Sequence, residues 1–309
     1  MKLYSLSSVC AIIGSVWAKG PGWKLDDSCK ANGWQDMVPT AVESAFSMAS
    51  DELDAVTRSI NKAETNEDIG NVIKWMFMKD GEEPNEERLG TLKTNLQNLV
   101  SAKTRKDNET PDRKTIVVYC SLDRFEKTDS GAYYDKDIKE TIKKGQSAFD
   151  HCKRKLPVVA YTWNPTDRSY PSQIQLCPWF LNWQKSVQSK ALLDARFKGN
   201  FYRAVAKGMS IHRTFFTPID MLSLLDKVIL HEMQHTIIGG SAMDVDMHSL
   251  KLIKYGWKRC LGLAQEGDTD RYRQSQLNAD TIAVAGNAIR YIKKNSIVKK
   301  NGEVVKKAS

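Results

Sequence analysis

The segment His231-Glu232-Met233-Gln234-His235 carries the clearest chemistry in this sequence. On an α-helix, positions i and i+4 lie on one face, one turn apart, so both imidazoles can bind a single Zn²⁺ at about 2.0–2.1 Å. Glu232 is one step round the helix, close enough to contact a water on the metal but badly placed to bind the metal itself. The pattern predicts a hydrolytic zinc site with two histidine ligands, a general base and an open coordination position.

The alternative interpretation is an apolar helix whose two histidines cap its end or fill the core. Four polar side chains cluster at the end of a segment that is mostly apolar from Met221 to Leu230. Polar groups near a core need a common partner, because burial without one is costly. A metal ion would supply that partner.

A third protein ligand is expected after Gly239-Gly240, because a glycine pair lets the chain reverse toward the metal and a carboxylate can bind zinc. Asp244 lies nine residues beyond the second histidine, and Asp246 is the competing ligand. Asp244 could instead cap a helix over Met247–Trp257.

Both helices and strands are needed to position these residues. The helix with the two histidines is expected to begin at Thr217-Pro218, a capping residue followed by proline, and to stop at the glycine pair. Helical periodicity predicts further helices over Ala41–Ala55, Ile69–Met78, Thr91–Val100, Phe180–Phe197 and Asn278–Ile292. Strands are predicted over Thr115–Tyr119, Val158–Trp163 and Gln173–Cys177, the last two forming a hairpin. These elements indicate an α+β fold with a small mixed or antiparallel sheet.

The composition is that of a globular protein. With 41% hydrophobic and 27% charged residues in 309, the chain is neither collagen-like nor wholly disordered. The net charge of +9 permits an acidic partner without requiring one. No stretch beyond residue 20 reaches the ~18 apolar residues of a membrane span.

The first 18 residues are expected to be a signal peptide. Met1-Lys2 is cationic, Leu3–Val16 is apolar, and Val16-Trp17-Ala18 offers small residues at the two positions that signal peptidase reads. A buried first helix is the alternative. Cleavage predicts a secreted, extracellular protein.

Residues 19–292 are expected to form a single domain, mainly helical over 19–110 and with the sheet and the metal-site helices over 111–292. Residues 293–309, Lys293–Ser309, carry six lysines against one glutamate. We expect them to form a disordered basic tail that contributes nothing to folding, rather than a binding segment for an anionic polymer.

Five cysteines remain after cleavage, and secretion permits disulfides. The predicted hairpin places Cys152 beside Cys177, which predicts a bridge between them. Cys29 would then pair with Cys120 and leave Cys260 as a small buried residue, although sequence alone leaves the connectivity of these three open.

The combination of His231-Glu232-x-x-His235, an aspartate nine residues on, Tyr255-Gly256 and Asn278-Ala279-Asp280 resembles the aspzincin metallopeptidases, the secreted, largely fungal deuterolysin and peptidyl-Lys metalloendopeptidase group. The likeness covers roughly residues 110–292. It implies a zincin-like fold around a central helix, one Zn²⁺ held by both histidines and Asp244, and Tyr255 as the donor to the oxyanion.

The family pattern Gly-Thr-x-Asp-x-x-Tyr-Gly is altered here. Met247 stands where the tyrosine belongs, and Tyr255-Gly256 follows eight residues later. An insertion would reconcile the two patterns. Otherwise the oxyanion donor is missing or is another group such as His248 or Tyr161.

These observations predict a secreted zinc metalloendopeptidase in which Glu232 is the general base. Its partners would be protein or peptide substrates, with no nucleic acid, and the protein is expected to be a monomer. The alternative is a secreted binding protein that keeps the zincin fold as a scaffold and has lost turnover.

Overall fold

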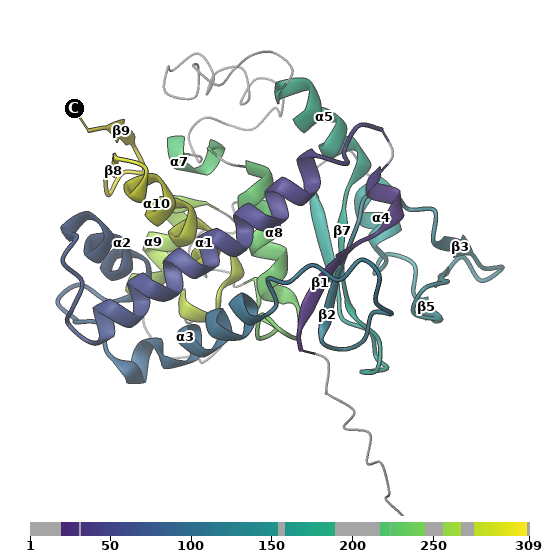
Figure 1. The fold of residues 1–309 in the computed structure, drawn as a ribbon, viewed down its shortest axis with the longest axis horizontal. Coiled ribbons are helices and arrows are strands. Elements are labelled where there is room, and N and C mark those ends of the chain that lie inside the picture. The colour runs from purple at the N-terminus through teal and green to yellow at the C-terminus, as the bar shows by residue number, and fades with distance from the viewer. Residues whose placement is uncertain are drawn as a thin grey trace, which may run out of the picture.

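Helices and small sheets occupy different parts of the molecule (Figure 1). The computed structural model describes residues 20–30, 32–153, 158–188, 217–222, 224–244, 256–266 and 275–307. The predicted α+β class is confirmed. Within the described residues, no helix combines the length and apolar character needed to cross a membrane. The expected signal peptide lies outside them.

Each predicted helix has a counterpart in the structure. The described helices are α1 (Met37–Ile60), α2 (Glu67–Phe77), α3 (Glu86–Ser101), α4 (Ala148–Lys153), α5 (Pro178–Gln188), α7 (Pro218–Met221), α8 (Leu224–His235), α9 (Trp257–Glu266) and α10 (Ala279–Lys293), with 3-10 turns η1 (Asp27–Lys30) and η4 (Ser275–Leu277). Of these, α4 and α9 were not predicted. The single helix predicted from Thr217 to the glycine pair is wrong. Leu222 adopts an extended conformation, which ends α7 before α8 begins.

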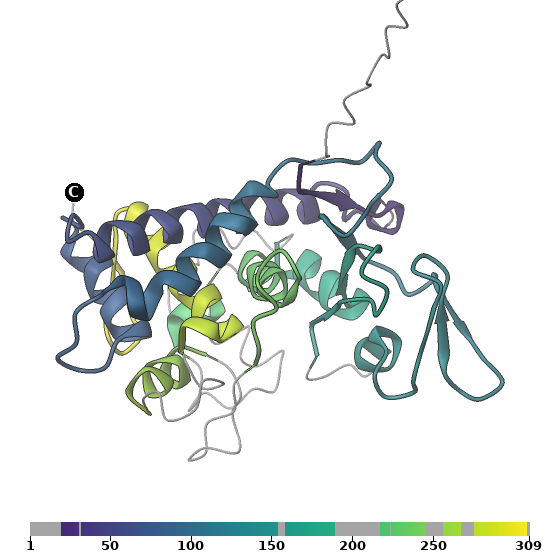
Figure 2. The ribbon, with the colours of Figure 1, turned by 90° about the horizontal axis from the view of Figure 1, so that it is seen from below.

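Among the described residues, the strands form three separate sheets. They are β1 (Gly22–Leu25), β2 (Thr115–Tyr119), β3 (Phe125–Lys127), β4 (Tyr133–Asp135), β5 (Glu140–Ile142), β6 (Ala160–Trp163), β7 (Ser172–Leu176), β8 (Ser296–Val298) and β9 (Val304–Lys306). The central sheet has the order β1-β2-β7-β6 and is parallel except for β6, which pairs antiparallel with β7. The predicted mixed sheet and its hairpin are therefore confirmed. The helix α8 packs against α1 and α10 and also against β6 of this sheet (Figures 1 and 2).

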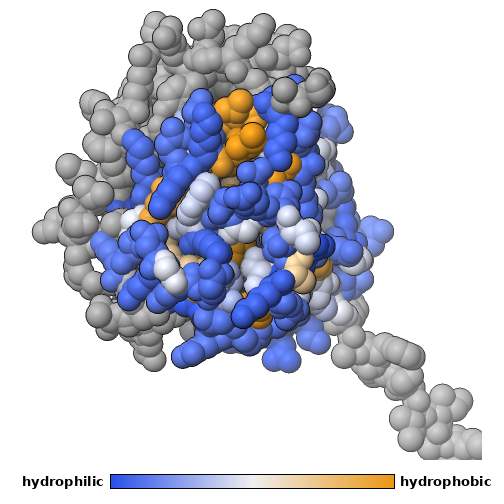
Figure 3. All heavy atoms as spheres, turned by 90° about the vertical axis from the view of Figure 1, so that its left-hand side faces the viewer, coloured by the Kyte–Doolittle hydropathy of each residue, from blue (hydrophilic) through white to orange (hydrophobic). Residues whose placement is uncertain are grey.

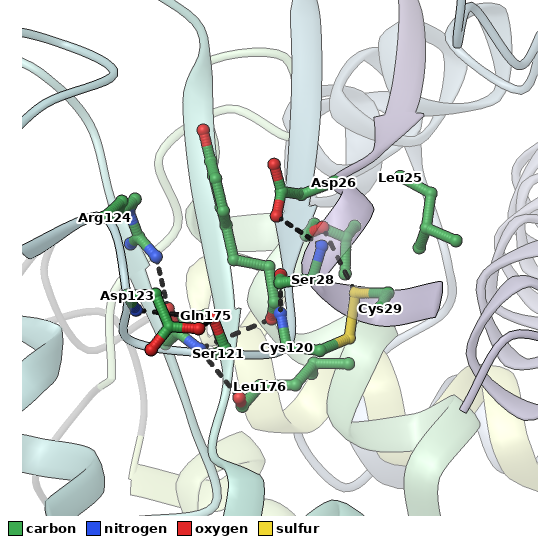
Figure 4. The surroundings of a disulfide bond; sticks show 12 residues. Leu25, Asp26, Ser28, Cys29, Cys120, Ser121, Asp123, Arg124, Gln175 and Leu176 are labelled. Atoms are coloured by element: carbon green, nitrogen blue, oxygen red, sulfur yellow. Dashed lines mark hydrogen bonds between the residues drawn. A yellow bond between two sulfur atoms is a disulfide. The ribbon is translucent and has the colours of Figure 1, made fainter. Parts of the chain in front are cut away.

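Two disulfides fasten the central sheet. Cys152 is bonded to Cys177 at the end of β7, and Cys29 to Cys120 at the end of β2 (Figure 4). Cys260 is free and buried. Both predicted pairs are confirmed, as is the buried site of the remaining cysteine.

A buried guanidinium joins the central sheet to the sheet β3-β4-β5. The Nε of Arg124 donates to Asp135 at 2.9 Å, and its Nη1 donates to the side chain of Gln175 on β7 (Figure 4). The guanidinium also stacks 3.9 Å from the ring centroid of Tyr119. These contacts of Arg124 link β7 to the sheet β3-β4-β5.

The helices α1, α8 and α10 pack closely around a buried carboxyl group, that of Glu52. A Cβ placed on Gly286 of α10 would lie 3.0 Å from the Glu52 Oε2 and 3.1 Å from Leu230 of α8, so the three helices meet closely at this glycine. In the described part of the chain neither oxygen of Glu52 has a hydrogen-bond partner. Burial therefore raises the pKa of Glu52 well above its ordinary value.

We expect Glu52→Gln to stabilise the protein increasingly as the pH rises. The folded state holds Glu52 neutral, whereas the unfolded chain ionises it above about pH 4.5, so wild-type stability is lost as the pH rises toward the raised pKa. Glutamine removes this loss, which amounts to at most about 1.4 kcal/mol per pH unit. Urea unfolding at pH 4 and pH 7 measures the difference. Exposed Glu43→Gln on the same helix is the control, and parallel pH profiles for Glu52→Gln and wild type would contradict the prediction.

The prediction of a disordered tail after residue 292 is wrong. β8 and β9 form a hairpin in which Val298 is only 2% exposed. Trp257 Nε1 donates to the carbonyl of Lys300 at 2.8 Å, and the Ile219 N–H donates to that of Gly302 at 3.1 Å. The hairpin is therefore part of the fold, docked on α10, α9 and α7.

Two lysines of this segment also form ion pairs with acidic residues of the N-terminal helices. Lys293 lies 2.8 Å from Asp51 of α1, and Lys307 lies 2.9 Å from Asp68 of α2. The surface on this side of the molecule is mainly hydrophilic (Figure 3). The prediction was based on composition alone. A few apolar residues and local counterions are enough to order a short hairpin that folds back on its own helix.

Truncation after Ile292 should lower the free energy of unfolding by about 2–5 kcal/mol, since it removes a buried valine and the hydrogen bonds to Trp257 and Ile219. Thermal unfolding of the truncated and full-length proteins measures the difference. Val298→Ala should reproduce part of the loss, whereas Val305→Ala on the exposed side of the hairpin should not. An unchanged melting temperature after truncation would show that the hairpin does not contribute to stability.

Candidate metal centre

The C-terminal turn of α8 presents both histidines of the predicted zinc site. Ile229, Leu230 and Met233 bury the other side of the helix in the core. The side chains of His231 and His235 are 12% and 19% exposed. The apolar residues thus fix the rotation of α8, and the imidazoles face the opposite direction, where solvent reaches them.

The chain reverses at the glycine pair, as expected. A Cβ on Gly239 would lie 2.0 Å from the carbonyl oxygen of Met233, so only glycine fits beside the end of α8. The Ala242 N–H then donates to the carbonyl of Gln234 at 2.8 Å. This return brings Asp244 back to the two histidines.

Three potential ligand atoms meet at this point. The Nε2 atoms of His231 and His235 are 3.0 Å apart, and Oδ1 of Asp244 lies 3.3 Å from the first and 3.5 Å from the second. In a tetrahedral zinc site with bonds of about 2.0–2.1 Å, neighbouring ligand atoms are about 3.3 Å apart. The three atoms therefore have the spacing of one face of such a tetrahedron.

The outer nitrogen atom of each ring faces an oxygen atom. His235 Nδ1 lies 2.6 Å from the carbonyl oxygen of Ala242, which can only accept, so Nδ1 carries a proton and, in the neutral ring, Nε2 keeps the lone pair that a metal would use. On the other ring, His231 Nδ1 faces Oδ1 of Asp280 at 3.8 Å. Both rings thus direct Nε2 toward Asp244, the orientation that metal binding needs.

The site attracts positive charge. Burial alone lowers the pKa of His235, but the hydrogen bond to Asp244 and the charges of Glu232 and Asp244 raise it to about 9. In the metal-free protein a proton therefore occupies the site at neutral pH. A metal cation would replace that proton.

Glu232 is fixed by the neighbouring strand. It is 6% exposed, and the Thr162 hydroxyl of β6 donates to its Oε2 at 2.6 Å. The Asn164 side chain donates to the carbonyl of His235 at 2.8 Å, at the end of α8. The predicted hairpin therefore holds the metal-site helix, but Thr162 and Asn164 themselves were not predicted, because nothing local in the sequence distinguishes them.

The segment before Asp244 is tied to the beginning of α10. The Met243 N–H donates to the carbonyl of Leu277 at 3.1 Å, and the Ala279 N–H donates to that of Met243 at 3.0 Å. Asn278-Ala279-Asp280, noticed in the sequence as part of the family resemblance, thus lies beside the candidate ligand. This bridge fixes where Asp244 can place its carboxylate.

Comparison with known proteins gives no relative of this chain. No family model matches it. No curated protein and no solved structure matches it either. The roles of these side chains are therefore inferred from their own contacts.

Of the side chains considered as oxyanion donors, the described residues include only Tyr161. Asp246, His248 and Tyr255 lie outside the described residues. The Tyr161 hydroxyl donates to the carbonyl of Gln146 at 2.9 Å, and burial together with the charge of Glu232 raises the pKa of Tyr161 to about 12. Tyr161 thus keeps its proton at neutral pH. In this structure, however, its hydroxyl donates to Gln146 and not to the metal site.

Proposed function

We propose that this protein is a secreted zinc metalloendopeptidase with a zincin-like fold. One observation carries the proposal: His231, His235 and Asp244 place three ligand atoms at zinc spacing, with Glu232 next to them. Zn²⁺, when bound, would lower the pKa of a coordinated water toward about 7 and polarise a peptide carbonyl. The leader-like residues 1–18 and the two disulfides support secretion.

Glu232 would act as the general base. Its carboxylate accepts the proton of the attacking water and passes it to the leaving amine, and the hydrogen bond from Thr162 keeps Oε2 in place through both transfers. Tyr255 would donate to the oxyanion, as the family resemblance implies. Its neighbour Gly256 is anchored through its N–H to Asp280 at 2.6 Å.

An extended peptide would bind along β6. In the described part of the chain β6 pairs with β7 on one side only, and its Thr162 contacts Glu232. A peptide strand added at the free edge would form backbone hydrogen bonds that tolerate many sequences. This placement brings a scissile bond beside α8.

A zincin-fold scaffold without turnover is the second candidate. It is favoured by one feature, Met247 at the family's tyrosine position. A scaffold has no use for a base, however, and the hydrogen bond that orients Glu232 argues for turnover.

Metal analysis and cleavage of an unstructured protein test both candidates. A peptidase should contain about one zinc ion per chain and should cleave, lose cleavage to a chelator and regain it with zinc. Bound zinc without cleavage would favour the scaffold. Absence of zinc at micromolar concentrations would overturn the metal site itself.

A further inference from the structure

Asp280 connects two parts of the candidate site. It lies in the first turn of α10 and is 7% exposed. Its Oδ2 accepts the N–H of Gly256 at 2.6 Å and lies 3.5 Å from the thiol of Cys260. Its Oδ1 faces Nδ1 of His231 at 3.8 Å. The two oxygens of one buried carboxylate therefore face the start of α9 and the ring of a candidate ligand.

The two histidines have different groups facing their outer nitrogens. For His235 that group is the backbone carbonyl of Ala242. For His231 the corresponding position is taken by a carboxylate oxygen of Asp280, at 3.8 Å. An acceptor that is itself fixed by Gly256 limits how far the His231 ring can turn.

We propose that Asp280 is a positioning residue of the zinc site, which holds the Nδ1–H tautomer of His231 and directs its Nε2 toward His235 and Asp244. This inference rests on the proposed zinc site. The same carboxylate accepts the backbone N–H of Gly256. One side chain thereby couples the geometry of a ligand to the beginning of α9.

Asp220 provides a matched control. It is 1% exposed, its Oδ1 accepts the N–H of Trp257 at 2.7 Å, and its Oδ2 accepts the N–H of Thr217 at 2.7 Å. Asp220 and Asp280 thus anchor consecutive residues at the start of α9. Only Asp280 also faces His231. A purely structural role would make the two residues behave alike.

The experiment compares Asp280→Asn with Asp220→Asn, both isosteric changes that remove a charge. Zinc affinity is measured by competition with a chelating dye, under conditions where circular dichroism shows each variant folded. Asparagine at 280 can still accept from Gly256 but turns an amide N–H₂ toward the Nδ1–H of His231. We expect Asp280→Asn to bind zinc about 10–100-fold more weakly than wild type. Asp220→Asn should remain within about threefold of wild type.

The outcomes separate this inference from the proposed function. If the wild type binds no zinc, the proposed function fails. If the wild type binds zinc and Asp280→Asn binds it equally well, only the positioning role is overturned. An equal loss in both variants would also overturn it, because the effect would then come from the start of α9.

A measurement on the wild type decides the matter if Asp280→Asn does not fold. In zinc-loaded protein labelled with ¹⁵N-histidine, the Nδ1–H of His231 should exchange slowly with water, because a buried carboxylate accepts it. Exchange as fast as that of an exposed imidazole would overturn the proposal.

Discussion

Replacing Glu232 by glutamine should reduce cleavage by roughly 10²–10⁴-fold and leave the zinc content unchanged. Glutamine keeps the size of the side chain and can still accept the hydrogen bond from Thr162, so the local structure should persist. It cannot take a proton from water at neutral pH. All three candidate ligands remain, so the variant should still bind zinc while its cleavage activity is lost. Zinc analysis and peptide cleavage on the same preparation measure the two effects.

Glu140→Gln is the control for this change. Its carboxylate accepts hydrogen bonds from Thr166, in the loop between β6 and β7. Glu140 is not among the residues of the candidate metal group. Cleavage by Glu140→Gln should therefore match the wild type. Full activity of Glu232→Gln would remove the base from the proposed mechanism, and loss of zinc would show that Glu232 supports the metal directly.

The local part of the site could be predicted from sequence. His231, Glu232 and His235 lie close together on one helix, and helical geometry fixes their relative positions whatever the rest of the chain does. The return at Gly239 is also local, because it depends on the conformations that glycine allows. These features follow from short-range spacing and backbone sterics.

The contacts that orient the site could not be predicted. Thr162 reaches Glu232 across 70 positions of the chain, and Asp280 faces His231 from another helix. Such pairs depend on how β6 and α10 pack against α8, which periodicity within one segment does not encode. The family resemblance drew attention to Asp280, but it gave no reason to place that carboxylate beside Nδ1.

The fold shows the same division between local and distant effects. The strand pattern and turn residues predicted the β6–β7 hairpin, and the hairpin in turn predicted the bridge of Cys152 to Cys177. The break at Leu222 and the docked hairpin β8–β9 were missed. Both depend on contacts between distant segments: the carbonyl of Gly302 accepts from Ile219, beside the break itself.

Replacing Asp244 by alanine should weaken zinc binding and lower the stability of the zinc-loaded protein together. Bound metal stabilises the folded state by mass action, by about 2.7 kcal/mol when free zinc is 100 times the dissociation constant. Removing a ligand that lies 3.3 and 3.5 Å from the two Nε2 atoms should abolish most of this gain. Melting temperatures measured with zinc and with chelator give the difference directly, and the variant should show little of it.

Asp246→Ala is the matched comparison, because sequence alone left both aspartates as candidates. Asp244 completes a group of three ligand atoms with His231 and His235, whereas Asp246 lies outside the described residues. Asp246→Ala should therefore keep the zinc-dependent rise in melting temperature. The opposite pattern, metal lost in Asp246→Ala but retained in Asp244→Ala, would mean that the family register is wrong. Tyr255 would then lose its inferred role as well, since its assignment as oxyanion donor depends on the same alignment of ligand and tyrosine.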